Sequence, residues 1–177
     1  PELRKEEQAY SQGLKDGIRR SGTVVNHQQK AETLIKATFN LRRQTTDRLK
    51  DIPAARRIRV YMANPDLTTY GSGKYTGLMM NHAGAMNVAA ATVKGYKQVS
   101  MEQILAWDPQ VLFVQDRYPQ VVDEIYQQPT WQALDAVKNH RVYLMPEYAK
   151  AWGYPMPEAM ALGELWMAKK LYPEKFK

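Results

Sequence analysis

Aromatic, basic and amide side chains gather in three segments of the chain, each placed directly after a run of apolar residues. Arg and Lys donate charge-assisted hydrogen bonds to anions, and aromatic rings stack on planar groups, so these residue types suit the binding of a small anionic or planar ligand. The alternative is that the aromatic rings only cover the ends of a sheet, an alternative that applies most to Tyr75 and Tyr148. The three segments carry Tyr70, Ser72, Lys74 and Tyr75; Gln115, Arg117 and Tyr118; and Tyr148, Lys150, Trp152 and Tyr154.

Catalytic and metal-binding chemistry has no comparable signal. The segment Gly71-Ser-Gly-Lys74 looks like part of a phosphate-binding loop, but Tyr75 replaces the Ser or Thr that would hold magnesium, and Thr68 stands where the first glycine belongs. The chain has no cysteine and only three widely spaced histidines, and no nucleophile elbow is present. We therefore expect a protein that is not an enzyme, with no cofactor and no metal bound by its own side chains.

The elements that must position the three segments alternate along the chain. Strands alternating with helices predict right-handed crossovers and a parallel sheet covered on both faces. The predicted fold class is thus α/β, a three-layer lobe with a small, mostly parallel sheet flanked by helices, and ligands of such sheets bind beyond the carboxyl ends of the strands. The predicted strands are 57–63, 111–114 and 141–145, with 88–93 as the candidate for a fourth. The predicted helices are 74–83, 99–107 and 157–172, and residues 119–137 hold one or two further helices, with Pro129 between them.

Two helices are predicted before this lobe. The first covers 2–20, and the second runs from a cap at Asn26 to about Asp51, where Pro53 ends it. About 26 residues at a rise of 1.5 Å make the second helix roughly 39 Å long, more than a compact domain usually needs. Its inward stripe follows steps of three and four residues: Ala31, Leu34, Ile35, Thr38, Leu41, Thr45, Leu49 and Ile52.

The net charge of +7 lies entirely in this helical part. Residues 1–59 hold 14 Lys and Arg against 7 Asp and Glu, whereas the remaining 118 residues are balanced. Few aromatic residues interleave with the basic ones, which favours a solvated helix surface, with a nucleic-acid-binding module as the alternative. In the 177 residues, no apolar run approaches the ~20 residues of a membrane span, and no signal peptide is expected in this sequence.

Five segments in order resemble a known family. They are Ala83-Gly-Ala-Met-Asn-Val-Ala89, Gln98-Val-Ser-Met-Glu-Gln-Ile-Leu105, Asp108-Pro-Gln-Val-Leu-Phe-Val114, the stretch from Trp131 to Tyr143, and the stretch from Leu162 to Phe176. Together they resemble the substrate-binding proteins of ABC importers for iron–siderophore, haem, cobalamin, molybdate and related complexes. These proteins have two lobes joined by one long helix. A nitrogenase-like metal-cluster enzyme shares the alternating fold but needs cysteine ligands, which are absent.

The resemblance implies an organisation and a function. Residues 53–177 would be the carboxyl-terminal lobe, 26–52 the connecting helix and 1–25 a helical remnant of the amino-terminal lobe. The protein would capture a metal complex, with a ferric siderophore as the first expectation, and deliver it to a membrane permease from the periplasm or from a lipid tether at the cell surface. It would be a monomer when full length.

The resemblance also suggests roles for individual residues. Glu102, in the Val-Ser-x-Glu start of a helix, matches the family's permease-docking glutamate, although ordinary helix capping also places an acid there. Arg117 would neutralise an anionic chelate or oxyanion, and further cleft residues would be Tyr75, Tyr118, Tyr148, Trp152 and Tyr154.

Overall fold

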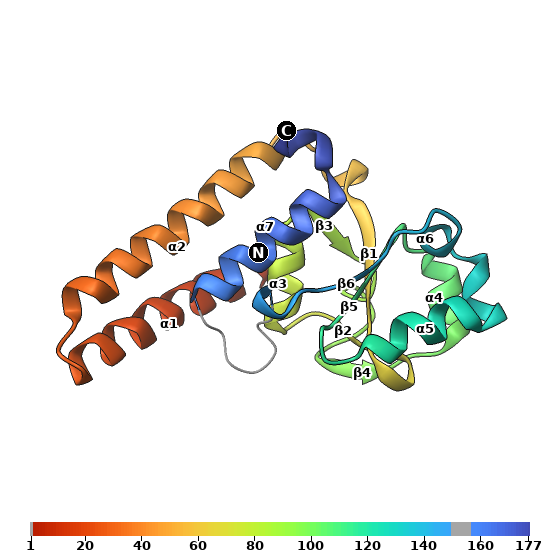
Figure 1. Cartoon of the computed structure of the whole chain (residues 1–177), viewed down its shortest axis with the longest axis horizontal. Helices are drawn as coiled ribbons and strands as arrows, with labels where there is room; N and C mark the ends of the chain where they lie inside the picture. The colour runs from red at the N-terminus through yellow and green to blue at the C-terminus, as the bar shows by residue number, and fades with distance from the viewer. Residues whose placement is uncertain (1, 150–156) are drawn as a thin grey trace.

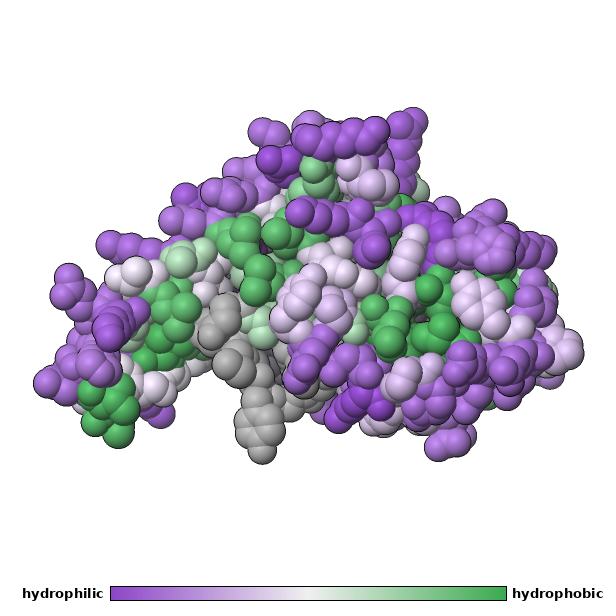
Figure 2. All heavy atoms as spheres, viewed as in Figure 1, coloured by the Kyte–Doolittle hydropathy of each residue, from purple (hydrophilic) through white to green (hydrophobic). Residues whose placement is uncertain are grey.

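A computed structural model describes residues 2–149 and 157–177. It consists of a helical hairpin, α1 (Glu2–Val24) and α2 (Gln28–Leu49), that extends from an α/β lobe (Figure 1). At the turn, Asn26 has a left-handed φ of 56° and His27 is the residue that precedes α2, so the predicted cap at Asn26 is wrong. Asn tolerates this conformation better than most residues, and the turn uses it for that property. An apolar spot marks the hairpin tip, where Val24 and Val25 are exposed (Figure 2).

The predicted stripe of α2 is largely confirmed. Ala31, Ile35, Thr38, Thr45 and Leu49 are buried, and the helix packs on α1 and on α7 (Pro157–Leu171). Arg42 is also buried, at 8% exposure, which corrects the expectation that the basic residues of this part form a solvated surface. Its burial has a physical reason, because a carboxylate from α7 compensates its charge, as described below.

The main sheet has four parallel strands in the order β3 (Ala85–Asn87), β1 (Ile58–Ala63), β5 (Val111–Val114) and β6 (Val142–Leu144). The three strands predicted at 57–63, 111–114 and 141–145 are confirmed. The fourth strand predicted at 88–93 is wrong, since it lies at β3 instead. Residues 88–93 wind into turns, with Val93 N–H donating to Ala89 O. Val88, Ala89 and Val93 are buried in that conformation, whereas Ala90 and Ala91 are exposed.

Helices cover both faces of this sheet (Figure 1). Because strand side chains alternate, β1 places Val60 and Met62 in an apolar cluster shared with α7 and α3 (Tyr75–His82). It places Tyr61 and Ala63 in a second cluster, shared with α4 (Met101–Trp107), α5 (Pro119–Gln127) and α6 (Asp135–Lys138). The molecule therefore has the three-layer α/β lobe that the sequence predicts.

A second, smaller sheet has two strands. β2 (Thr68–Tyr70) pairs antiparallel with β4 (Tyr96–Gln98) beside the carboxyl end of β1. Gly71 follows β2 and lies so close to Val93 that an added Cβ would approach the Val93 carbonyl oxygen to 1.9 Å. Only glycine allows this contact, which fixes the small sheet against the turns at 88–93.

Candidate functional site

Two polar residues follow neighbouring strands at the carboxyl edge of the sheet. Ala63 and Val114 are register partners of β1 and β5, so the next residues, Asn64 and Gln115, meet directly beyond the sheet. Gln115 Nε2 donates to Asn64 Oδ1 at 2.6 Å, and Arg117 Nε donates to Gln115 Oε1 at 2.7 Å. Gln115 is fully buried and Asn64 is 4% exposed, whereas Arg117 is exposed. A chain of two buried side-chain amides, linked by hydrogen bonds, thus ends in an exposed guanidinium.

Tyrosine side chains surround this chain of hydrogen bonds. The Arg117 guanidinium carbon lies 4.9 Å from the centre of the Tyr118 ring, and the Tyr70 hydroxyl accepts a hydrogen bond from Gln115 Nε2 at 3.1 Å. The Tyr70 ring packs against Tyr96, with centroids 4.8 Å apart. Burial raises the pKa of Tyr70, so its hydroxyl remains neutral near pH 7. We call Asn64, Tyr70, Gln115, Arg117 and Tyr118 the carboxyl-edge cluster.

The predicted ligand residues are only partly brought together. Arg117 and Tyr118 belong to the carboxyl-edge cluster. Tyr148 lies in the 3-10 turn Glu147–Ala149 that follows β6 and is 55% exposed. Trp152 and Tyr154 lie outside the described residues. Tyr75 occupies a different cluster, where its ring packs edge-on against Tyr10 at 5.6 Å and its hydroxyl accepts from Arg42 Nη2 at 3.0 Å.

That second cluster joins four helices. Both oxygens of Glu164 on α7 accept hydrogen bonds from Arg42 on α2 at 2.9 Å. His82 on α3 lies between two carboxylates, with Nδ1 2.9 Å from Glu164 Oε1 and Nε2 2.8 Å from Glu7 Oε1 on α1. Glu164 is fully buried, and Arg42 and His82 are nearly so. We call Glu7, Arg42, Tyr75, His82 and Glu164 the helix-junction cluster.

The charges of the helix-junction cluster compensate one another. Burial by itself lowers the pKa of His82, but the hydrogen bond and the charge of Glu164 outweigh it, so the pKa is raised. With a carboxylate at each ring nitrogen, the doubly protonated imidazolium satisfies both acceptors. Two cations then face two anions, and this arrangement is that of a structural ion network.

Sequence reasoning missed the partners within both clusters. Gln115 and Tyr70 lie in the candidate segments, but Asn64 does not. The position of Asn64 directly after a buried strand is the signal that marks it, since the adjacent strand ends in another amide. Arg42 and Glu164 are 122 residues apart, and the only signal for Arg42 was a basic residue within an apolar stripe.

Glu102 lies in the first turn of α4 and is exposed. Ser100 precedes the helix and caps it, because its Oγ accepts from the Gln103 N–H at 3.1 Å. The cap explains why the helix begins here. It is made by Ser100 and Gln103, and the Glu102 side chain is not part of it.

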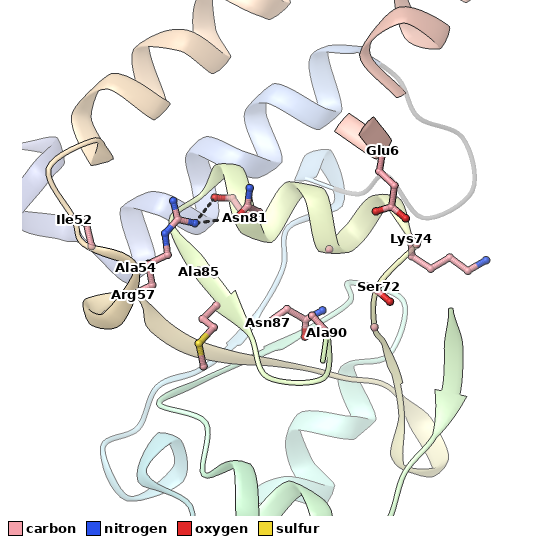
Figure 3. A pocket seen from close by; sticks show the side chains of 14 residues that line it. Glu6, Ile52, Ala54, Arg57, Ser72, Lys74, Asn81, Ala85, Asn87 and Ala90 are labelled. Carbon is pink, nitrogen blue, oxygen red and sulfur yellow. Dashed lines mark hydrogen bonds between the residues drawn. The ribbon is translucent and has the colours of Figure 1, made fainter. Parts of the chain in front are cut away.

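A pocket of about 450 Å³ lies beside the edge strand β3, along α3 and the Gly71–Lys74 segment (Figure 3). Its polar groups do not converge. Arg57 Nη1 donates to the carbonyl and side-chain oxygens of Asn81, each at 3.0 Å, at one end, whereas Lys74 extends away from the pocket at the other end. Glu6 lies near Lys74 and places a carboxylate beside the segment that resembles a phosphate loop. The pocket therefore lacks the donor arrangement of the carboxyl edge.

Two further features of the described part of the chain bear on function. Residues 2–149 and 157–177 contain no group of three or more His, Asp or Glu side chains arranged to hold a metal ion. None of the helices within the same ranges combines the length and apolar character needed to cross a bilayer.

Comparison with known proteins gives a consistent set of relatives. A model of the family described as periplasmic binding protein matches residues 3–149. The molybdate-binding protein MolA of Haemophilus influenzae is 59% identical over 176 residues, which make up 99% of this chain and 50% of that protein. An uncharacterised ABC transporter substrate-binding lipoprotein of Bacillus subtilis is 27% identical over 174 residues, 96% of this chain and 53% of that protein.

Solved structures agree. MolA of H. influenzae bound to molybdate matches with a TM-score of 0.90 and 60% identity, over 97% of this chain and 52% of that chain. An ABC transporter solute-binding protein of Sulfurospirillum deleyianum matches with a TM-score of 0.79 and 29% identity, over 94% and 53% of the two chains. The chain thus spans about half the length of the curated relatives it matches.

Proposed function

The chain belongs to the periplasmic binding protein family, and from this premise we propose that it is the carboxyl-terminal half of a solute-binding protein that captures a metal oxyanion for an ABC importer. Molybdate is the first ligand to test, because the MolA relative of 59% identity is named for binding it. The ferric siderophore expected from sequence gains no support from that relative. The observation that carries the proposal is the Asn64–Gln115–Arg117 chain at the carboxyl edge of the sheet.

The geometry of the carboxyl-edge cluster favours a small anion over a large planar one. Arg117 supplies a positive charge beside hydroxyl and amide groups within a few ångströms, and charge-assisted hydrogen bonds of this kind are short and strong. The edge of an open parallel sheet is where such folds bind ligands. We propose Arg117 and Tyr118 as ligand contacts, with Tyr148, Trp152 and Tyr154 as cleft-wall residues from the adjoining segment. The cluster that holds Tyr75 gives it a structural role instead.

The helical hairpin fits a two-lobed parent protein. The relatives are about twice as long as this chain, and α2 spans roughly 33 Å at 1.5 Å per residue, enough to bridge two lobes. We propose residues 26–52 as the connecting helix, 53–177 as the carboxyl-terminal lobe and 1–25 as part of the other lobe. The ligand would lie between the lobes, at the edge that carries Arg117.

Location and partner follow from the family. The relatives include proteins named as periplasmic or as lipoproteins, so we propose an extracytoplasmic protein that docks on a membrane permease. The exposed Glu102 is the proposed contact with the permease. The nucleic-acid alternative gains no support from the basic segment, because Arg42 is enclosed by Glu164 and Arg19 is paired with Glu32 at 2.7 Å.

The decisive experiment is a titration of the protein with molybdate, followed by isothermal calorimetry and by NMR chemical shifts. We expect binding, and we expect Arg117→Ala to weaken it roughly 10- to 150-fold, since a hydrogen bond to a charged group contributes about 1.5–3 kcal/mol. The matched control is Arg43→Ala, which removes an equal charge from an exposed site on α2. Equal affinities of Arg117→Ala and wild type would remove Arg117 from the site.

Glu102→Gln separates docking from binding. It should leave molybdate affinity unchanged and reduce the stimulation of the permease's ATPase in reconstituted vesicles. If it altered the affinity and not the stimulation, the docking role would be wrong.

A further inference from the structure

Arg117 sets the orientation of the buried Gln115 amide. A guanidinium has only hydrogen-bond donors, so the atom of Gln115 that receives Arg117 Nε at 2.7 Å must be its oxygen. The nitrogen of the same amide therefore faces the other way. There it donates to Asn64 Oδ1 at 2.6 Å and to the Tyr70 hydroxyl at 3.1 Å, which uses both of its hydrogens.

The same constraint passes on to Asn64. Its oxygen accepts from Gln115, so its nitrogen is the terminal donor of this chain of hydrogen bonds. Asn64 Nδ2 is buried and has no hydrogen-bond partner among residues 2–149 and 157–177. Buried donors in folded proteins are almost always paired, so this one indicates an acceptor that comes from beyond those residues.

From this chain of hydrogen bonds we infer that Gln115 is a positioning residue that determines specificity. It keeps the amide oxygens of the cluster turned inward, so that the carboxyl edge presents hydrogen-bond donors. The inference deepens the proposed function and rests on it. Both side-chain amide oxygens accept from donors within the cluster, so the two ends of the hydrogen-bond chain are donors, the exposed Arg117 guanidinium and the buried Asn64 amide N–H. The Tyr70 hydroxyl also accepts from Gln115.

An edge that offers donors selects ligands whose outer atoms are all acceptors. Molybdate and sulfate carry no proton near pH 8, so each of their oxygens can accept. Hydrogen phosphate carries an O–H group, which would meet a donor and leave a buried polar group unpaired. Binding should therefore favour fully deprotonated oxyanions over a protonated anion of similar size and equal charge.

Gln115→Glu reverses the direction of the hydrogen bond between residue 115 and Asn64. The new carboxylate pairs with Arg117 and accepts from Asn64, so the Asn64 oxygen turns outward and the edge loses both a donor and net positive charge. We expect molybdate and sulfate affinities, measured by calorimetry and NMR near pH 8, to fall tenfold or more. Gln120→Glu, an exposed change of the same charge five residues away, is the matched control and should have less than a threefold effect. Gln115→Met removes the hydrogen bonds of Gln115 without adding charge and should also weaken binding. It provides the test if Gln115→Glu does not fold.

The outcomes separate the inference from the proposed function. Molybdate binding that is equal in wild type and in both Gln115 variants would overturn the role inferred for Gln115 and leave the proposed binding function intact. Hydrogen phosphate binding as tightly as sulfate would reveal an acceptor in the site, for which Asp116, next to Gln115 in the sequence, is the first candidate. That result would also overturn the inference about Gln115. A wild-type protein that binds a metal chelate and none of the three anions would overturn the proposed ligand class itself.

Discussion

Each of the two polar clusters of this molecule contains an arginine, but the two arginines differ in burial and in the partners of their guanidinium groups. In the helix-junction cluster, Arg42 donates to Glu164 and Tyr75, and His82 is held between Glu164 and Glu7. In the carboxyl-edge cluster, Arg117 donates inward through Nε while its guanidinium remains exposed. The first network is closed and charge-balanced, and the second is open toward solvent.

This difference separates the structural use of an arginine from the ligand-binding use that we propose for Arg117. A buried arginine that met no counter-charge would destabilise the fold, so the closed cluster exists only because Glu164 is present. An exposed arginine on a rigid, buried amide chain has no such requirement and keeps donors for a ligand. We therefore expect changes in the closed cluster to alter stability, and changes in the open cluster to alter binding.

The largest expected effect comes from Glu164→Gln. It leaves Arg42 and His82 buried without their shared carboxylate, and breaking a buried ion pair in this way costs about 3–5 kcal/mol in the free energy of unfolding. Urea denaturation of wild type and variant measures the loss. Glu32→Gln, which breaks the exposed pair with Arg19, serves as control and should leave the midpoint almost unchanged. If Glu164→Gln instead weakened anion binding with little loss of stability, the distinction between the clusters would fail.

A smaller effect should appear in the pH dependence of stability. The pKa of His82 is raised in the folded state above its unfolded value of about 6.5, because its partner Glu164 outweighs the effect of burial. The resulting stabilisation is fully present below about pH 6.5 and is lost as the pH rises through the folded-state pKa. The charged groups that face the imidazole are Glu7 from α1 and Glu164 and Arg42 from α7 and α2.

Unfolding free energies of wild type and His82→Gln at several values between about pH 6 and about pH 9 test this linkage. The wild type should lose stability over that interval relative to the variant. His27→Gln changes an exposed histidine that makes no side-chain cap and should follow the wild-type curve. Parallel curves for wild type and His82→Gln would show that His82 is not charged in the folded protein.

The sequence predicts the lobe well because its signals are local. Apolar runs, Pro and Gly punctuation and the Ser100 cap identify β1, β5, β6 and α4 without knowledge of their partners. The site is predicted less completely, because its parts meet across the chain. Residue type and position after a strand make Arg117 and Tyr118 candidates, whereas the contact of Asn64 with Gln115, 51 residues away, has no such local signal.

The same limit explains the elements that were missed. β2 and β4 are short and polar, and β4 is exposed, so no apolar alternation marks them. The apolar run at 88–93 resembles a buried strand in the sequence, but only Val88, Ala89 and Val93 are buried, and they are held in turns. Burial of Arg42 requires a counter-charge on a helix more than a hundred residues later, which no local pattern reveals.

The smallest expected effects come from a matched pair of tyrosines, one in each cluster. Tyr75→Phe removes the hydroxyl that accepts from Arg42, so it should cost about 1 kcal/mol of stability, the net contribution of a typical hydrogen bond, and leave anion affinity unchanged. Tyr70→Phe removes the hydroxyl that accepts from Gln115, which leaves one Gln115 amide hydrogen without its acceptor and holds the amide less firmly. It should weaken molybdate binding severalfold with a smaller loss of stability. Denaturation and calorimetry on both variants give a two-by-two comparison. The opposite result, with Tyr75→Phe impairing binding, would return Tyr75 to the ligand site and show that the two clusters act as one.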